Sequence, residues 1–195
     1  MTAQLRPRFA VTIAAIGFGA IACANDGDER SVSPYAATPD SVVVAMLAMA
    51  AVGPRDYVID LGSGDGRLVI AAVKRGARAL GVDIDAKLVD LARRFAERDG
   101  VAERALFVEQ DLFATDLSQA SVITIYLLPS IMGKVATKLA AELRPGARVV
   151  THDFPLPGWR IDRVEQFDVP EKRDYTFNDR ATIYLYTVPA TSARR

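Results

Sequence analysis

The segment spanning residues 57–67, with the sequence YVIDLGSGDGR, constrains the fold of this chain more than any other segment. It starts as a short apolar strand, passes through a turn with glycines at positions 62, 64 and 66, and continues into an apolar helix. Glycine at a strand-to-helix turn has no Cβ, so a ligand can approach the backbone closely. The segment therefore predicts an α/β domain with a ligand site at this turn.

The residues around the glycines discriminate between classes of ligand. A dinucleotide-binding turn has its third glycine where this chain has Arg67, and the Gly-Lys-Ser/Thr ending of a phosphate-binding loop is absent. Two acids, Asp60 and Asp65, flank the turn instead. Carboxylates repel a pyrophosphate and attract a ligand with ammonium and sulfonium charges. The turn thus favours a cationic adenosyl ligand, and a nicotinamide dinucleotide remains a weaker alternative.

Composition limits the other possibilities. The chain has 195 residues, half of them hydrophobic, which suffices for one domain with a sizeable core. Lys+Arg and Asp+Glu are balanced at 24 each, so no overall field attracts nucleic acid, and we expect no nucleic-acid partner. A single cysteine, Cys23, excludes an internal disulfide framework and a cysteine-based zinc site, and we expect no metal.

The first 23 residues differ from the rest of the chain. Arg6 and Arg8 precede an apolar stretch over residues 9–22, a pattern typical of a signal peptide and short for a membrane span of about 20 residues. Residues 20–23, Ala-Ile-Ala-Cys, resemble a bacterial lipobox with alanine in place of the usual leucine. We expect a signal peptide, lipoprotein signal or membrane anchor over 1–23, with a misassigned start as the alternative.

These assignments predict a domain layout and a location. Residues 24–33 are polar and are interpreted as a linker, and residues 34–195 as the folded domain. A working leader makes the protein membrane-associated, with the domain outside by the positive-inside rule. If the leader is not functional, the protein is expected to be cytoplasmic.

From residue 57 onward, strand and helix patterns alternate, which predicts a parallel sheet. We expect strands at residues 58–61, 79–83, 105–108, 122–128 and 149–151, and two more near 161–167 and 181–188. Helices are expected at 40–51 with Thr38 as N-cap, at 68–73, after Asp85 and from Ser130. The predicted fold is a Rossmann-like, doubly wound α/β sheet of seven strands, mostly parallel with an antiparallel C-terminal strand.

Three acids fall at the ends of successive predicted strands: Asp60, Asp83 and Asp111. Ligands of such sheets bind beyond the carboxyl ends of the strands. Asp83 has the spacing from the glycine turn that suits chelation of ribose hydroxyls, and Ile84 then lies beside the adenine. Each acid alone is better explained as a cap or a solvated turn residue. Their occurrence together with the glycine turn favours a cofactor site.

Residues 60–66, in the pattern D-x-G-x-G-x-G, resemble the first motif of class I S-adenosylmethionine-dependent methyltransferases. With residues 34–39, 60–72 and 143–159, the chain resembles a subfamily whose mitochondrial members methylate lysines in ATP synthase subunit c and the adenine nucleotide translocase. The resemblance implies S-adenosyl-L-methionine as cofactor and a protein lysine as acceptor. Asp111, with Leu112 nearby, then contacts the adenine amino group. The implied cofactor-binding residues are Tyr35, Thr38, Asp60, Gly62, Ser63, Gly64, Asp65, Gly66, Asp83, Ile84, Asp111 and Leu112.

The chain also departs from that subfamily. It has Gly-Val-Asp-Ile-Asp at residues 81–85 where those members have a Glu-Leu-Asn sequence, although Asp83 in place of glutamate preserves ribose chelation. Its leader also lacks the interspersed arginines of a mitochondrial presequence.

Candidate acceptor-side residues follow the fourth and fifth predicted strands. We predict catalytic roles for Tyr126, His152 and Asp153, although a lone histidine such as His152 is more often structural. Trp159 either lines an acceptor pocket or simply packs. Many methyltransferases of amides or base amino groups have Asp/Asn-Pro-Pro-aromatic after strand four, and this chain has Tyr-Leu-Leu-Pro at residues 126–129, which argues against that activity.

The predicted function is therefore methylation of a protein lysine by in-line transfer. Two alternatives stay open: a small-molecule methyltransferase, and an envelope lipoprotein whose domain binds an adenosyl ligand without catalysis. The second alternative is motivated by the leader, because S-adenosylmethionine is made in the cytosol.

Overall fold

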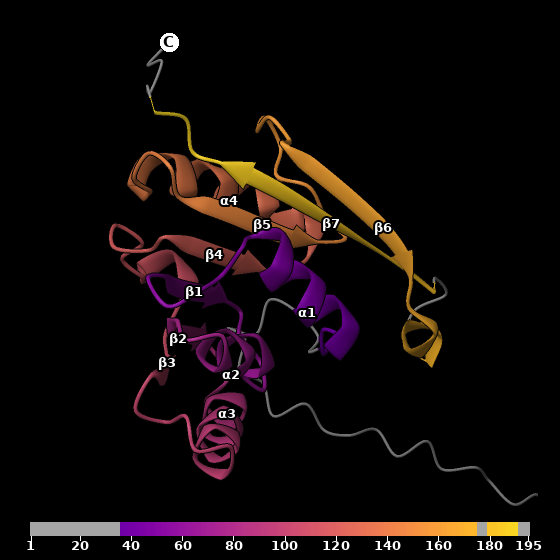
Figure 1. Cartoon of the computed structure of the whole chain (residues 1–195). Coiled ribbons are helices and arrows are strands. Elements are labelled where there is room, and N and C mark those ends of the chain that lie inside the picture. The colour runs from indigo at the N-terminus through magenta and orange to yellow at the C-terminus, as the bar shows by residue number, and fades with distance from the viewer. Residues whose placement is uncertain (1–35, 175–178, 191–195) are drawn as a thin grey trace, which may run out of the picture.

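The computed structural model describes residues 36–174 and 179–190, so Tyr35 and the predicted leader and linker lie outside the described residues. Figure 1 shows one sheet between helices. The strands are β1 (Tyr57–Leu61), β2 (Arg78–Asp83), β3 (Ala105–Glu109), β4 (Val122–Ile125), β5 (Arg148–His152), β6 (Arg163–Asp168) and β7 (Arg180–Thr187). The helices are α1 (Asp40–Met49), α2 (Arg67–Lys74), α3 (Ala86–Arg98) and α4 (Pro129–Glu142), with short 3-10 helices η1 (Leu112–Ala114) and η2 (Pro170–Asp174).

The seven strands lie in the order β3-β2-β1-β4-β5-β7-β6. The pairs from β3 to β5 are all parallel, whereas β7 runs antiparallel between β5 and β6. The predicted doubly wound, mostly parallel α/β sheet with an antiparallel C-terminal strand is therefore confirmed. The order of connection reverses between β1 and β4, and the carboxyl ends of strands at such a switch point form a crevice for a ligand.

Apolar side chains cover both faces of the sheet because alternate residues of a strand point to opposite sides. On one face, Val58 of β1 belongs to a core that includes residues of α1, α2 and α3. On the other face, Ile59 and Leu61 of the same strand belong to a core with residues of α4. Figure 1 shows the corresponding placement of α4 across the sheet from α1, α2 and α3. The two cores fix the strand ends that carry the site.

Two local predictions are wrong. β4 ends at Ile125 instead of continuing to residue 128, because the apolar run leads straight into α4, which starts at Pro129. Proline is well suited to the first helical position, since its missing N–H has no partner there anyway. Thr38 is not the N-cap of α1. Pro39 occupies that position, and no side chain caps the helix.

The described residues contain no helix that is both long enough and apolar enough to cross a membrane.

Candidate functional site

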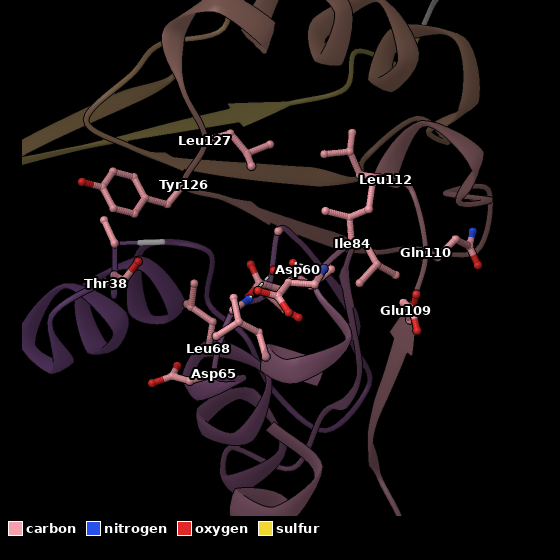
Figure 2. A pocket seen from close by; sticks show the side chains of 18 of the residues that line it. Thr38, Asp60, Asp65, Leu68, Ile84, Glu109, Gln110, Leu112, Tyr126 and Leu127 are labelled. Atoms are coloured by element: carbon pink, nitrogen blue, oxygen red, sulfur yellow. Dashed lines mark hydrogen bonds between the residues drawn. The ribbon is translucent and has the colours of Figure 1, made fainter. Parts of the chain in front are cut away.

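A cavity of about 720 Å³ lies beyond the carboxyl ends of β1, β2 and β4, at the switch point of the sheet. Figure 2 shows Thr38 and Tyr126 at one end of this cavity and Glu109 and Gln110 at the other. Predicted site residues that line it are Thr38, Asp60, Gly62, Ser63, Gly64, Asp65, Asp83, Ile84, Asp111, Leu112 and Tyr126. Gly66, His152 and Asp153 do not line it.

The glycine turn that links β1 to α2 needs its glycines for two different reasons. Gly62, Gly64 and Gly66 all have φ between 52° and 81°, a left-handed conformation that other residues adopt only with strain. A Cβ on Gly66 would lie 2.6 Å from the ring of Phe107 and 2.8 Å from the Cβ of Ala92. Gly66 therefore permits close packing of the turn against β3 and α3, whereas Gly62 and Gly64 line the cavity.

Asp83, the last residue of β2, is held by two backbone donors. The N–H of Gly64 donates to Oδ2 at 2.8 Å, and the N–H of Asp85 donates to Oδ1 at 3.0 Å. A carboxylate oxygen accepts about two hydrogen bonds, so each oxygen retains capacity for one hydroxyl donor. This arrangement fits a vicinal diol such as that of ribose, with the carboxylate already fixed to the glycine turn.

Asp60, near the end of β1, is almost fully buried at 2 % exposure. Its Oδ1 accepts a hydrogen bond of 2.7 Å from the Thr124 hydroxyl on the neighbouring β4. Burial raises the pKa of Asp60 to about 7, the Thr124 hydrogen bond lowers it, and the nearby Asp83 and Asp65 carboxylates raise it further. A cationic group of a ligand in the cavity would favour the charged form, because an opposite charge nearby stabilises a carboxylate.

Asp111 both caps a helix and lines the cavity. Its Oδ1 accepts from the N–H of Phe113 at 2.8 Å, which makes it the N-cap of η1. Asp85 caps α3 in the same way through the N–H of Lys87. The cap interpretation and the cofactor interpretation of Asp111 are therefore compatible, since a carboxylate can serve both kinds of donor.

Tyr126 forms the other end of the cavity, and His152 lies behind it. The two rings have centroids 4.0 Å apart. His152 is buried, and neither of its ring nitrogens has a hydrogen-bond partner among the described residues. Burial lowers the pKa of His152 to about 4, against the raising effect of Asp153 and together with the lowering effect of Lys172. The imidazole is thus neutral at pH 7, and burial together with Asp153 raises the pKa of Tyr126, so its phenol is protonated.

Lys172, in η2, is a buried cation that the sequence analysis did not single out. It is 2 % exposed, forms an ion pair with Asp153 Oδ2, and donates to the carbonyl of Arg180 at 2.8 Å. Asp153 has a φ of 59°, and its Oδ1 accepts from the N–H of Thr182 at 3.1 Å. The two carboxylate oxygens of Asp153 thus bind β7 and η2. No sequence signal marks Lys172, because its neighbours are polar and its partner is 19 residues away.

Trp159 packs on the sheet and does not line the cavity. Its indole N–H donates to the carbonyl of Ala136 in α4 at 3.3 Å, and its ring meets Tyr186 edge to face at 6.1 Å. Of its two interpretations from sequence, the geometry matches packing.

Several known proteins are similar to this chain in sequence. Residues 60–163 match a family model described as "ANTKMT methyltransferase domain". A protein-lysine N-methyltransferase of Saccharolobus islandicus (strain REY15A) is 39% identical over 157 residues, which cover 80% of this chain and 93% of that protein. The adenine nucleotide translocase lysine N-methyltransferase of Mus musculus is 37% identical over 145 residues, 70% of this chain and 63% of that protein.

A solved structure is also similar to this chain. An RNA methyltransferase from Salinibacter ruber, in complex with S-adenosyl-L-homocysteine, has a TM-score of 0.73 and 40% sequence identity, covering 82% of this chain and 98% of that one. The acceptors around the cavity suit the same class of compound, since Asp83 can accept from ribose hydroxyls and the flanking carboxylates suit a cationic tail. S-adenosyl-L-methionine is therefore the cofactor, and the dinucleotide alternative is excluded. Family model, relatives and site geometry agree that this chain belongs to the ANTKMT methyltransferase domain family of S-adenosylmethionine-dependent enzymes.

Proposed function

We propose that this enzyme methylates the side-chain amine of lysine in a protein. Two relatives named as lysine N-methyltransferases support this acceptor, and the archaeal one matches nearly its whole length. The mouse relative is longer, and this chain spans 63% of it.

Charge around the cavity is the observation that carries the proposal. Of the described residues that line the cavity, the acids are Asp60, Asp65, Asp83, Asp85, Glu109 and Asp111, and the only Lys or Arg is Arg67. Arg67 forms a 2.6 Å ion pair with Asp65, so its charge is offset. A lysine ammonium is attracted to such a surface before it loses its proton.

RNA is the competing acceptor, because the similar structure from Salinibacter ruber is described as an RNA methyltransferase. RNA binding relies on Lys and Arg to neutralise phosphates. Asp85, Glu109 and Asp111 are exposed at the rim of the cavity and would repel phosphates. The electrostatics therefore favour a cationic peptide over a polynucleotide.

The chemistry of the step assigns roles to this chain's own residues. S-adenosyl-L-methionine supplies a methyl group on a sulfonium sulfur; as the new C–N bond forms, the C–S bond breaks and its electrons stay on sulfur. The acceptor amine must first lose a proton to expose its lone pair. His152 is a poor base for that proton, because its pKa is about 4 and it lies behind Tyr126. We assign proton loss to solvent and amine orientation to the Tyr126 hydroxyl, with Asp83 and the glycine turn holding the donor.

The test is transfer of a radioactive methyl group from S-adenosylmethionine to a cell extract. We expect label in material that protease destroys and ribonuclease does not, and methylated lysine after acid hydrolysis. Asp83→Ala should abolish transfer, while Lys74→Met, on the far surface of α2, should leave it unchanged. Label that ribonuclease removes would show that RNA is the acceptor and overturn the lysine proposal. Label found only in small molecules would exclude both protein and RNA as acceptors.

We further propose that residues 1–23 attach the enzyme to a membrane. Support comes from the sequence pattern, with Arg6 and Arg8 before an apolar stretch and Cys23 after it. Mass spectrometry of the protein from fractionated cells should find a chain that begins at a lipid-modified Cys23, or an intact leader in the membrane fraction. An unprocessed chain in the soluble fraction contradicts this attachment.

A further inference from the structure

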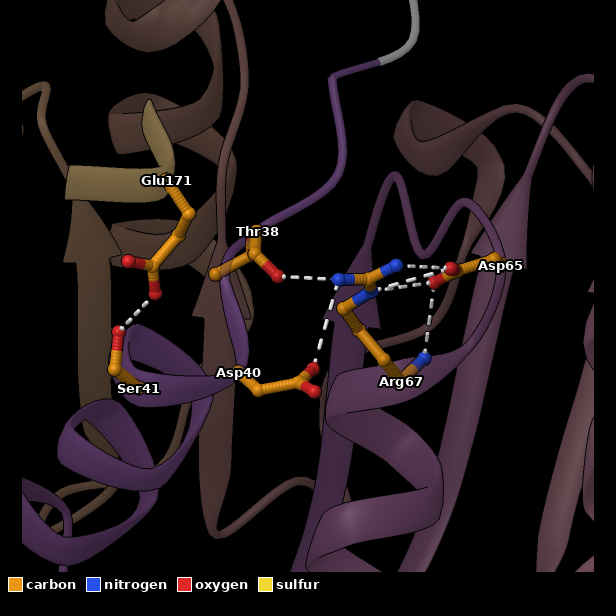
Figure 3. Close-up of polar contacts among 6 residues, drawn as sticks. All are labelled: Thr38, Asp40, Ser41, Asp65, Arg67 and Glu171. Carbon is orange, nitrogen blue, oxygen red and sulfur yellow. Dashed lines mark hydrogen bonds and ion pairs between the residues drawn. The ribbon is translucent and has the colours of Figure 1, made fainter. Parts of the chain in front are cut away.

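Arg67 connects two segments that are far apart in the sequence. It is the first residue of α2, and its Nε lies 3.0 Å from Asp65 Oδ1 while its Nη2 lies 2.6 Å from Asp65 Oδ2. Its Nη1 donates to the backbone carbonyl of Thr38 at 2.9 Å and lies 3.6 Å from Asp40 Oδ1. Figure 3 shows the guanidinium between Asp65 on one side and Thr38 and Asp40 on the other.

The segment that Arg67 holds, residues 36–41, is called the strap below. Three of its residues, Ala36, Ala37 and Thr38, line the cavity, and Thr38 is only 6 % exposed. Figure 2 places Thr38 and Tyr126 at the same end of the cavity, opposite Glu109 and Gln110. With Asp83 and Ile84 at the adenosine side, the strap forms part of the wall at the end where an acceptor must reach the methyl group.

The geometry of this contact requires arginine. A guanidinium is a planar fork, so two of its nitrogens can pair with one carboxylate while the third donates elsewhere. A lysine ammonium at this position keeps the positive charge beside Asp65 but lacks the fixed fork that spans to the Thr38 carbonyl. Arg67 also stands where a dinucleotide-binding turn has glycine, which has no side chain to make such a connection.

A second contact anchors the strap independently of the glycine turn. The hydroxyl of Ser41 donates to Glu171 Oε1 in η2 at 3.0 Å (Figure 3). This hydrogen bond is exposed and does not involve the cofactor turn. Two contacts thus hold the strap. The contact through Arg67 and Asp65 depends on the glycine turn, whereas the hydrogen bond from Ser41 does not.

We propose that Arg67 is a positioning residue that couples the two ends of the cavity: a ligand that fixes the glycine turn also fixes Asp65, Arg67 and hence the strap. The cofactor end is then filled before the acceptor end is fully formed, which favours binding of S-adenosylmethionine before the acceptor. Coupling of this kind is reciprocal, so an ordered strap also strengthens binding at the turn.

The test measures hydrogen–deuterium exchange of the strap amides with and without S-adenosylhomocysteine, alongside its affinity by calorimetry. In the unmodified enzyme the ligand should slow exchange of the strap about tenfold, within the usual range of coupling between sites. Arg67→Lys should lose most of that protection and, because the coupling is reciprocal, bind S-adenosylhomocysteine no more than about tenfold more weakly than the unmodified enzyme. Ser41→Ala is the matched control and should keep it, although its strap exchanges somewhat faster.

Two results would overturn the coupling. One is equal ligand protection of the strap in Arg67→Lys and in the unmodified enzyme. The other is a loss of affinity in Arg67→Lys far larger than the loss of protection, which would make Arg67 part of the cofactor site itself. Arg67→Gln, which also lacks the fork, provides a second variant with the same expectations. No acceptor enters the measurement, so its outcome is independent of whether lysine is the residue methylated.

Discussion

The two ends of the cavity are built differently. At the cofactor end, the acids of β1 and β2 are held by nearby donors: Asp83 by Gly64 and Asp85, and Asp60 by Thr124. Behind Tyr126 at the acceptor end, His152 is buried without a hydrogen-bond partner among the described residues, and Asp153 depends on Lys172 from a distant segment. The cofactor end is thus a preorganised set of acceptors for a ligand common to many enzymes, whereas the acceptor end relies on aromatic rings and one buried ion pair.

The largest effect is expected at the acceptor end. Lys172→Met removes the ammonium from a pair whose lysine side chain is 3 % and aspartate side chain 21 % exposed. Loss of one partner of a buried pair leaves the other charge uncompensated, which costs about 3–5 kcal/mol of unfolding free energy. Urea denaturation measures this loss, with Lys74→Met as control: its pair with Asp99 is exposed at the lysine side, so its loss should change the unfolding free energy little. Similar losses of unfolding free energy in Lys172→Met and Lys74→Met would contradict this prediction.

At the cofactor end, a single methyl group tests how tightly the turn is packed. A Cβ on Gly81 of β2 would lie 2.6 Å from Ser63 Oγ and 2.7 Å from Phe107 Cδ1. Gly81→Ala should therefore cost about 1–3 kcal/mol of unfolding free energy and weaken S-adenosylhomocysteine binding, because Ser63 belongs to the turn. Gly133→Ala in α4, with no atom within 4 Å of the added Cβ, should instead stabilise by about 0.5–1 kcal/mol. Thermal unfolding and calorimetry distinguish the two variants.

The buried histidine predicts an acid-sensitive acceptor end. The folded-state pKa of His152, about 4, is below its ordinary value of 6.5, so the unfolded chain binds the proton first as pH falls. Its contribution to stability is therefore present above pH 6.5 and is lost as pH falls toward 4. His152→Leu should change stability little at pH 7 and raise it by about 2 kcal/mol relative to the unmodified enzyme at pH 5. Urea denaturation at both pH values checks this, and an equal effect at pH 5 and pH 7 would refute it.

The smallest effect concerns proton linkage at the cofactor end. The pKa of Asp60 is about 7 in the folded protein, raised above the ordinary 3.8. Its favourable contribution to stability is therefore present below pH 4 and is lost as pH rises toward 7. A cationic ligand group favours the ionised form, so we expect S-adenosylhomocysteine to bind up to about tenfold more tightly at pH 8 than at pH 6, with proton release. Asp60→Asn should abolish this slope in calorimetric titrations. An unchanged slope in the variant would assign it to another group.

The sequence could predict the cofactor end because its contacts are local or follow from strand geometry. Asp60 lies next to the end of β1 and Asp83 ends β2, and the carboxyl ends of parallel strands meet at one edge of the sheet. The glycine spacing identified the ligand class for the same reason, since a turn of fixed length connects β1 to α2. The assignment of individual cofactor contacts stays a prediction until a ligand is bound.

The acceptor end could not be predicted in the same way. The apolar run over residues 122–128 concealed the end of β4, because apolar composition does not distinguish a buried strand from the approach to a helix. Thr38 was interpreted as a helix cap, and the structure uses its backbone carbonyl, which every residue type carries. Lys172 contributes through a fold-dependent contact with no motif. The catalytic roles predicted for Tyr126, His152 and Asp153 stay predictions, with Tyr126 alone lining the cavity.

The position of β7 has a consequence for the order in which the enzyme is completed during synthesis. Among the described residues, β7 is the last strand along the chain, yet it lies inside the sheet, between β5 and β6. While the chain emerges from the ribosome, β1 to β3 can pair before residue 180 is made, and domains generally start to fold from the N-terminal side. During that interval the edge of β5 that later pairs with β7 has no partner strand, and Asp153 lacks its contact with Thr182. A nascent chain stalled before β7 should therefore already compete for the cofactor while still being vulnerable to proteases and to strand-to-strand association at β5.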